Sequence, residues 1–203
     1  MTDLLSIHPR NPQRRLLTRG AALIRAGAVV AYPTDSTYAL GCHIGDKGAL
    51  ERIRAIRRLE RRHLFTLVCR DLSEISSYAR VNNASYRILK RYTPGPFTFL
   101  LTATREVPRR LTHPKRRTIG LRVPDHSVAL GLLEELGEPL MSTSLILPGD
   151  PTPLSDAGDI GGRLAGLVDL VIDSGPCGLE PTTVVDLTQE LPAVVRPGVG
   201  RFE

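Results

Sequence analysis

The chain has 203 residues, of which 41% are hydrophobic and 24% are charged, and its mean hydropathy is −0.07. This length suits one well-packed domain, and the composition excludes a disordered or a membrane-embedded protein. We therefore expect residues 1–203 to form a single domain. Residues 1–19 hold no apolar run typical of a signal peptide or membrane span, so we expect a cytoplasmic location.

The formal net charge of +6 comes mainly from arginine, because only three of the 27 basic residues are lysines. Arginine suits bidentate binding of phosphate or carboxylate, although a bias in genome composition explains an arginine excess equally well. The positions of the arginines in the sequence must therefore decide whether they bind an anionic ligand. Cys42, Cys69 and Cys177 lie far apart without C-x-x-C spacing, which predicts neither a zinc site nor a disulfide framework.

Apolar periodicity and turn residues predict helices that alternate with short strands. The predicted helices cover residues 14–26, 46–58, 72–79, 84–91 and 127–136. The predicted strands cover residues 28–32, 65–69, 97–102, 119–122, 140–142, 170–172, 184–187 and 194–196. This order indicates an α/β fold with a mixed sheet flanked by helices. The segment 148–162 is rich in Pro and Gly and is predicted to be a long mobile loop of the kind that forms ligand lids.

Residues with hydroxyl groups lie at the ends of three predicted strands, in segments 34–37, 142–144 and 182–183. Strand ends build ligand crevices in α/β proteins, so three such clusters indicate one polar site. For the first segment an ordinary turn is the alternative, since Pro, Asp and Ser favour turns. The sequence contains neither of the common glycine-rich nucleotide motifs, so side chains would have to hold a nucleotide.

Arginines are concentrated before two of the predicted strands. Residues 52–62 contain six arginines and precede His63, and residues 105–122 contain seven basic residues. A solvated helix end explains the first group equally well, because the helix dipole favours cations there. Arg122 lies inside an apolar strand, where it is expected to meet an internal carboxylate or an anionic ligand. No hydrolase triad motif, H-E-x-x-H motif or acidic cluster is present, so no metal site is predicted.

These segments resemble the YrdC/YciO family. Its synthase members carry the patterns P-T-[DE]-[ST]-x-[YF]-[GA], K-x-R, S-[TPA]-S-A-N and [ST]-T-x-x-D, together with a strand arginine. The corresponding positions here are 33–39, 57–59, 142–146, 182–186 and Arg122. The YciO branch resembles this chain further in segments 8–13, 69–74, 106–110 and 142–145. The resemblance spans nearly the whole chain.

The resemblance implies a single α/β domain with a twisted mixed sheet and a concave, positively charged cleft. Synthase members of the family join L-threonine, bicarbonate and ATP into threonylcarbamoyl-AMP and pyrophosphate, the first step toward the t6A modification of tRNA. Mg²⁺ would accompany the ATP rather than occupy a protein cage. Positioning and charge neutralisation dominate such a reaction, and no covalent nucleophile is needed.

The resemblance also implies a role for individual residues. The residues expected to contact threonine are Ser36, Arg122, Ser142 through its backbone, and Thr182. The residues expected to face the nucleotide are Arg57, His63, Thr118, Ser144, Thr152 and Arg196. Arg57 takes the place of the motif lysine near the phosphates, and Arg122 pairs with the amino-acid carboxylate. These two arginines are the expected catalytic residues.

Two departures from the synthase pattern, one in the segment after Arg57 and one after Ser144, weaken the transfer of these roles. Leu59 replaces the second cation of K-x-R, Ile146 replaces a polar residue of S-A-N, and His63 stands where the pattern has Lys or Asn. Loss of one phosphate-binding arginine is expected to cost about 2–4 kcal/mol of transition-state stabilisation. Arg58, Arg61 or Arg62 would have to compensate.

Three functions therefore stay open from the sequence. The first is a threonylcarbamoyl-AMP synthase, or a slow version of one in view of these departures. The second is a non-enzymatic protein that binds double-stranded RNA or tRNA, because a domain with a pI near 9.6 attracts phosphate backbones. The third is a related enzyme that forms a carbamoyl-adenylate on another amine.

Overall fold

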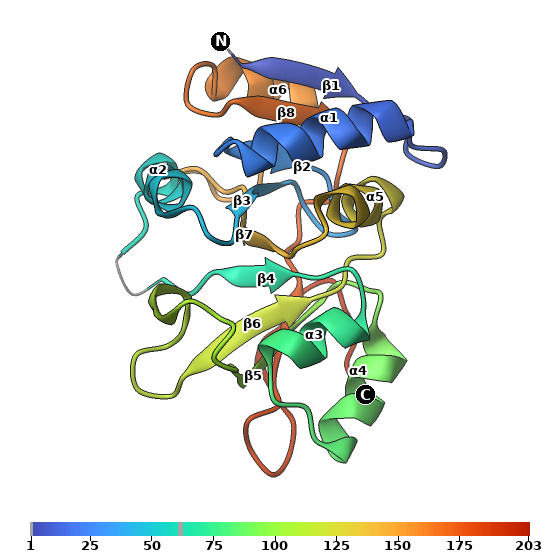
Figure 1. Ribbon diagram of the computed structural model, residues 1–203, viewed down its shortest axis with the longest axis vertical. Coiled ribbons are helices and arrows are strands. Elements are labelled where there is room, and N and C mark those ends of the chain that lie inside the picture. Colours follow the sequence, from blue (N-terminus) through green and yellow to red (C-terminus); the bar gives the residue numbers. More distant parts are fainter. Residues whose placement is uncertain (1, 61–62) are drawn as a thin grey trace.

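Ten strands form one mixed sheet in the computed structural model, which describes residues 2–60 and 63–203. The strand order is β1-β8-β2-β3-β7-β4-β6-β5-β9-β10, with parallel and antiparallel neighbours. Figure 1 shows these strands stacked from β1 at the top to β5 near the bottom. The chain is thus a single α/β domain with helices on both sides of the sheet, as the sequence predicts.

The elements have the following bounds. The strands are β1 (Asp3–Ser6), β2 (Val30–Tyr32), β3 (Ala39–His43), β4 (Thr66–Val68), β5 (Phe97–Thr102), β6 (Thr118–Arg122), β7 (Leu140–Ser144), β8 (Leu170–Asp173), β9 (Thr183–Asp186) and β10 (Ala193–Arg196). The helices are α1 (Arg14–Arg25), α2 (Lys47–Arg57), α3 (Leu72–Tyr78), α4 (Asn83–Tyr92), α5 (Ser127–Leu136) and α6 (Ala157–Arg163), with a 3₁₀ turn η1 (Arg109–Leu111).

Every predicted helix and strand is present within two residues of its expected ends. The prediction of one long loop over residues 148–162 was wrong, because α6 begins at Ala157. Asp156 caps this helix by accepting a hydrogen bond from the backbone N of Asp159 at 3.0 Å. Three glycines in the segment 157–163 weaken its helical signal in the sequence.

The sequence analysis also missed the strands β1 and β3. β1 is an edge strand of four residues that pairs in parallel with β8. β3 begins two residues after the hydroxyl-rich segment 34–37 and pairs antiparallel with both β2 and β7. The segment 34–37 is therefore the turn of a hairpin rather than a connection to a helix. This hairpin turn holds the hydroxyl groups at a fixed place on the sheet.

Two groups of helices cover different parts of the sheet. The buried residues of α1 and α5 pack on one face of β1, β8, β2 and β3, where Val30 and Tyr32 point toward them. The buried residues of α2, α3, α4 and α6 pack on the opposite face, which Ala31 shares. Alternate residues of one strand thus serve separate cores, as the strand period of two requires.

The side chains on one part of the first face are unusually small. The strand register places Gly120 beside Thr66, and Thr66 beside Ser142, in one row across β6, β4 and β7. In Figure 1, α1 and α5 lie beside the upper strands, away from β6 and β5. Small side chains without a covering helix leave a hollow there, and this hollow is the candidate site.

No helix within the residues that the structure describes combines the length and the apolar character needed to cross a membrane.

The packing of α1 against α5 yields a prediction about stability. Leu132 is fully buried, and its Cδ1 would lie 3.2 Å from a Cβ added at Gly20 of α1. We expect Leu132→Ala to lower the free energy of unfolding by about 2–5 kcal/mol, because it leaves a cavity between the two helices. Urea denaturation measures this loss. Leu4→Ala, at a side chain that is 58% exposed, is the control and should cost far less.

Candidate functional site

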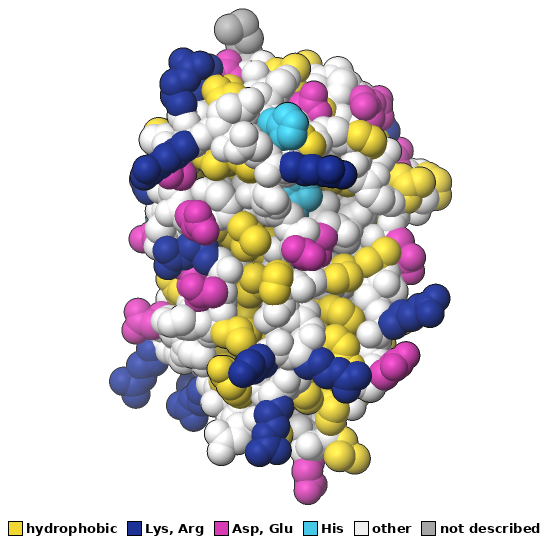
Figure 2. All heavy atoms as spheres, turned by 90° about the vertical axis from the view of Figure 1, so that its right-hand side faces the viewer, with side chains coloured by type: hydrophobic (Ala, Val, Ile, Leu, Met, Phe, Trp, Pro, Cys, Tyr) yellow, Lys and Arg dark blue, Asp and Glu magenta, His cyan; other side chains and the backbone are white. Residues whose placement is uncertain are grey.

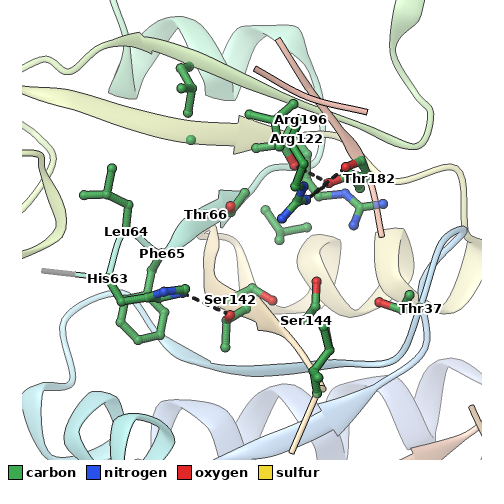
Figure 3. A pocket seen from close by; sticks show the side chains of 18 of the residues that line it. Thr37, His63, Leu64, Phe65, Thr66, Arg122, Ser142, Ser144, Thr182 and Arg196 are labelled. Carbon is green, nitrogen blue, oxygen red and sulfur yellow. Dashed lines mark hydrogen bonds between the residues drawn. The ribbon is translucent and has the colours of Figure 1, made fainter. Parts of the chain in front are cut away.

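The hollow is a cleft of about 220 Å³ that residues from β3, β7, β4, β6, β5, β9 and β10 line together with the end of α2. Figure 3 shows the polar side chains that point into it from opposite walls. The polar lining residues are Thr37, Arg57, His63, Thr66, Thr98, Arg122, Ser142, Thr143, Ser144, Thr182 and Arg196. Three guanidinium groups and seven hydroxyl groups thus face one cavity.

Arg122 is buried at the end of β6 and forms an ion pair with Asp35. Its Nη1 also donates to the Ser36 hydroxyl at 3.3 Å. Two buried polar atoms of this ion pair, Asp35 Oδ2 and Arg122 Nε, have no hydrogen-bond partner among the described residues. The internal carboxylate that the sequence left open as a partner for Arg122 is therefore present. The ion pair therefore retains one acceptor and one donor that can still form hydrogen bonds.

The turn that carries Asp35 and Ser36 is fixed by Thr34. The Thr34 hydroxyl donates to the carbonyl of Thr37 at 2.6 Å and accepts from the backbone N of Ser36 at 3.2 Å. Thr and Ser hydroxyls often stabilise such turns by bonding to the nearby backbone. The neighbouring loop packs tightly on the turn, because a Cβ added at Gly178 would lie 2.6 Å from the Ser36 carbonyl oxygen. A rigid turn thus presents the carboxylate to Arg122.

Arg57 extends from the last turn of α2 to the end of β7. Its Nε donates to the carbonyl of Ile146 at 2.6 Å, and its Nη1 donates to the Ser144 carbonyl at 2.6 Å and to the Thr143 hydroxyl at 2.9 Å. Neutral groups therefore hold this guanidinium in place. Burial lowers the pKa of Arg57 from its usual value, but an arginine keeps its charge at every relevant pH.

Arg196 lies on the opposite wall, where β10 ends. Its Nη2 donates to the carbonyl of Thr182 at 2.9 Å and to the Thr182 hydroxyl at 3.3 Å, as the dashed lines in Figure 3 show. The Thr182 hydroxyl also shares a hydrogen bond of 2.9 Å with Thr98. Burial lowers the pKa of Arg196 as it does for Arg57. Again, neutral partners hold the cation.

His63 is half-buried at the entrance to β4, with its ring edge-on to Phe65 at 5.4 Å between centroids. Its Nε2 lies 3.4 Å from the Thr143 hydroxyl. Burial lowers its pKa, and the charges of Arg57, Arg54 and Arg196 lower the pKa further. Burial first, and the positive charges of the cleft second, thus favour the neutral imidazole.

The cleft has an excess of positive charge. Among the ion pairs of residues 2–60 and 63–203, only that of Arg122 with Asp35 involves a cleft arginine. Arg57 and Arg196 thus remain without a carboxylate, and the lining hydroxyls can donate hydrogen bonds. This arrangement suits an anion such as a phosphate or carboxylate.

Seven of the predicted site residues line the cleft together. They are Arg57, His63, Arg122, Ser142, Ser144, Thr182 and Arg196. Ser36 contacts the cleft through Arg122. The Ser142 hydroxyl is bound to Tyr32 Oη at 2.8 Å and to the Leu40 carbonyl at 3.1 Å. That internal bonding is compatible with the expected role for the Ser142 backbone.

Two predicted nucleotide-binding residues are not among the lining residues. Thr118 begins β6 and shares the strand face of Gly120, further from the centre of the cleft. Thr152 is exposed in the segment before α6. Of the arginines expected to compensate for Leu59, Arg58 borders a separate depression with Ile56 and Leu147, and Arg61 and Arg62 lie outside the described residues. Leu59 itself packs against the main core.

Two lining residues with hydroxyl groups, Thr66 and Thr98, were not predicted from the sequence, whereas Thr37 and Thr143 belong to the predicted hydroxyl segments but were given no individual role. Thr66 and Thr98 lie within predicted apolar strands, where a threonine is typical of β structure and gives no separate signal. Their outward positions become informative only once the strand register places them beside Gly120 and Arg122.

The described residues contain no group of three or more His, Cys, Asp or Glu side chains that could hold a metal ion. The cleft lining offers hydroxyl and guanidinium groups, which are donors suited to anions rather than cations.

The fold and the cleft together define an α/β protein that presents arginines and hydroxyls on an open sheet face. The chain belongs to the Sua5/YciO/YrdC family, whose model carries the description "telomere recombination" and matches residues 22–198. Within it, the chain is 54% identical over 200 residues to the uncharacterized protein YciO of Escherichia coli, covering 98% of this chain and 97% of YciO. An uncharacterized protein of Haemophilus influenzae is 57% identical over 201 residues, with 98% and 97% of the two chains covered.

The structural comparisons agree with this assignment. The crystal structure of E. coli YciO matches with a TM-score of 0.95 over 99% of this chain and 98% of that chain. P. abyssi Sua5 complexed with L-threonine matches with a TM-score of 0.88 at 29% identity, over 97% of this chain and 58% of that chain. The threonylcarbamoyl-AMP synthase of Bacillus subtilis is 30% identical, over 98% of this chain and 56% of its own length. This chain thus spans little more than half of these two relatives.

The buried ion pair of the cleft yields a second prediction about stability. We expect Arg122→Met and Asp35→Asn each to destabilise the fold, the first by about 3–5 kcal/mol because it leaves a buried carboxylate unpaired. The double variant should lose less than the sum of the two, which a double-mutant cycle in urea measures. Arg19→Gln, which breaks an exposed pair with Asp3, is the control and should cost less than about 1 kcal/mol. Additive losses at Arg122 and Asp35 would contradict the coupling.

Proposed function

We propose that this protein is a threonylcarbamoyl-AMP synthase that acts in tRNA t6A modification. In this reaction L-threonine, bicarbonate and ATP give threonylcarbamoyl-AMP, pyrophosphate and water. The observation that carries the proposal is the cleft itself, where Arg57, Arg122 and Arg196 converge with seven hydroxyls and only one paired carboxylate. The resemblance to synthases, one of which is complexed with L-threonine, supports the choice of substrate.

The reaction requires two bonds to form in sequence. The threonine nitrogen attacks the carbon of bicarbonate, and loss of water leaves a carbamate. A carbamate oxygen then attacks the α-phosphorus of ATP, the bond from that phosphorus to the bridging oxygen breaks, and pyrophosphate leaves. Negative charge accumulates on the phosphates in the second step, so fixed cations and a correct approach geometry supply most of the acceleration.

Each predicted residue receives a role in this proposal. On the threonine side, Arg122 pairs with the carboxylate, while Ser36, the Ser142 backbone and Thr182 contact the rest of the amino acid. On the nucleotide side are Arg57, His63, Thr118, Ser144, Thr152 and Arg196. Thr118 and Thr152 would contact the parts of the nucleotide that extend beyond the cavity. Arg57 and Arg122 are the catalytic residues of this proposal, since Arg57 compensates phosphate charge and Arg122 orients threonine through its carboxylate.

The donor set of the cleft suits ATP, because guanidinium and hydroxyl groups both donate hydrogen bonds to phosphate oxygens. Mg²⁺ would enter with the nucleotide, held by phosphate oxygens and water, and would neutralise part of the phosphate charge. Residues of the chain then need only to orient the complex. Arg57, held at the end of β7, and Arg196, held at Thr182, border the cleft from different strands and are placed to do so.

The departures from the synthase pattern favour a slow enzyme. Leu59 packs against the core instead of supplying a cation, and Ile146 puts an apolar side chain into the cleft. With one fewer phosphate-binding arginine, the transition state loses stabilisation of about 2–4 kcal/mol.

Pyrophosphate release from ATP tests the proposal. We expect release that depends on both threonine and bicarbonate, and a fall of about 10²–10³ in rate for Arg57→Met, because phosphate charge is then less compensated. Arg58→Met, in the neighbouring residue that borders another depression, is the matched control and should keep the rate. Calorimetry should find threonine affinity unchanged in both variants.

Two results would reject this function. Pyrophosphate release that is no faster with threonine than without it would exclude synthase activity. Faster release with another amine would favour a related enzyme that forms a carbamoyl-adenylate.

A second candidate function, binding of RNA or tRNA, has one specific observation in its favour. The segment before β6 exposes six basic residues against a single acidic one, Glu106. They are Arg105, Arg109, Arg110, Lys115, Arg116 and Arg117. This segment lies at the left of Figure 1, whereas the face in Figure 2 shows basic and acidic side chains interspersed. A one-sided concentration of cations is the electrostatic footprint of a polyanion site.

If this segment binds RNA, affinity should depend steeply on salt. We expect log K to fall linearly with log salt concentration, and the double variant Lys115→Gln, Arg116→Gln to reduce the slope by about two, one for each lost phosphate contact. Fluorescence anisotropy with a tRNA over a salt series measures both. Arg15→Gln, an exposed arginine on α1, is the control and should leave the slope unchanged. Binding that resists high salt would contradict an electrostatic site.

A further inference from the structure

His63 is the one titratable side chain of the cleft lining that can change its charge near neutral pH, because the other ionisable lining residues are the arginines 57, 122 and 196. Its imidazole borders the cavity from the segment before β4. It is linked to Arg57 through the Thr143 hydroxyl, which lies within hydrogen-bond distance of both side chains. Whether His63 is neutral or protonated therefore sets the total charge that the cleft offers to a ligand.

The hydrogen bonds around Thr143 define the neutral state of this imidazole. Arg57 Nη1 can only donate hydrogen bonds, and it donates one to Thr143 Oγ1 at 2.9 Å. The Thr143 hydroxyl hydrogen is then free to point at His63 Nε2, 3.4 Å away. In the neutral tautomer that carries its hydrogen on Nδ1, Nε2 accepts this hydrogen bond. The ring is held by one weak contact and keeps its basic nitrogen toward the cleft.

The charged groups around His63 all oppose its protonation while the cleft holds no anion. Arg54 and Arg57 face it from α2 and Arg196 from β10, and these charges together with burial lower its pKa. Arg122 of β6 borders the same cavity. The acidic residue nearest along the chain, Glu60, is exposed, and its backbone carbonyl accepts a hydrogen bond from the backbone N of His63 at 3.0 Å. An anion placed among these cations would reverse the local potential and favour the imidazolium.

We propose that His63 is a proton-linked cation of the cleft: an oligophosphate group binds together with one proton from solvent, which His63 takes up at Nε2. The protonated nitrogen then donates a hydrogen bond toward the phosphate oxygens, beside the guanidinium of Arg57. This inference rests on the proposed function only for the class of ligand, a phosphate anion in this cleft. It requires no threonine-dependent chemistry.

Linkage fixes the sign of the effect. In the free cleft the pKa of His63 is below its ordinary value, and the bound anion raises it. Affinity is therefore constant above the pKa of the complex, rises as pH falls between the two pKa values, and is constant again below that of the free protein. A rise of one pKa unit, the lower end for an opposite charge within about 4–6 Å, corresponds to about tenfold in affinity.

Two substitutions reproduce the two charge states of His63. His63→Asn keeps a neutral polar group, and His63→Lys keeps a permanent cation. These are also the residue types that the synthase pattern carries at this position. Wild type is expected to bind inorganic pyrophosphate like His63→Asn at high pH and like His63→Lys at low pH. Pyrophosphate itself binds protons in this range, so each comparison uses the difference between wild type and His63→Asn at the same pH.

Calorimetry in two buffers of different ionisation enthalpy counts the protons taken up with pyrophosphate. We expect wild type to take up as much as one proton more than His63→Asn, and about tenfold tighter binding for His63→Lys than for His63→Asn at pH 8. His126→Asn is the matched control, because His126 is another half-buried histidine with a lowered pKa, lies outside the cavity lining, and caps α5 as asparagine also can. It should leave the proton uptake unchanged.

An NMR titration of the wild-type protein makes the test independent of how the variants fold. The His63 ring signal should report a pKa at least one unit higher with saturating pyrophosphate than without it. An unchanged His63 pKa, or equal proton uptake by wild type and His63→Asn, overturns the inference while leaving the proposed synthase intact. Proton-linked binding without threonine-dependent turnover supports the inference and rejects the synthase. Failure to bind pyrophosphate at all overturns both.

Discussion

The site depends on placing uncompensated positive charge on a part of the sheet face that none of the described helices covers. Burial of a charged group costs several kcal/mol unless partners replace its hydration. Arg57 and Arg196 obtain those partners from the backbone carbonyls of Ile146, Ser144 and Thr182. Carbonyl dipoles stabilise a cation without removing its net charge, so both arginines stay available to an anionic ligand.

The same requirement explains why the lining residues are small. Gly120, Thr66 and Ser142 form a row across β6, β4 and β7, and their short side chains leave room for the cavity that the three guanidinium groups border. A larger residue in place of Gly120 would meet Thr66 and Thr98, since even a Cβ there lies 3.2 Å from each. Hydroxyls in this row also supply hydrogen bonds, so packing and polarity favour the same residues.

The sequence predicted most elements of this fold because their signals are local. Apolar periodicity found α5, and the side chain of Asp46 marks the start of α2 by accepting from Ala49 N at 2.8 Å. β3 and α6 were not predicted, because a hairpin register and a glycine-rich helix depend on tertiary contacts. Likewise, seven predicted site residues line one cleft, but Thr66 and Thr98 could be placed there only from strand order, which no local pattern encodes.

Asp35 differs from the other partners because it is a full negative charge. Its pair with Arg122 offsets one of three cleft cations, and it is placed by a turn that Thr34 makes rigid. Three guanidiniums without any carboxylate would repel one another strongly in a medium of low dielectric constant. One internal carboxylate reduces that repulsion while leaving Arg57 and Arg196 unneutralised. Because Asp35 sits at Arg122, the residual positive charge is concentrated on the Arg57 and Arg196 walls, which is where a polyphosphate rather than a single carboxylate gains the most from binding.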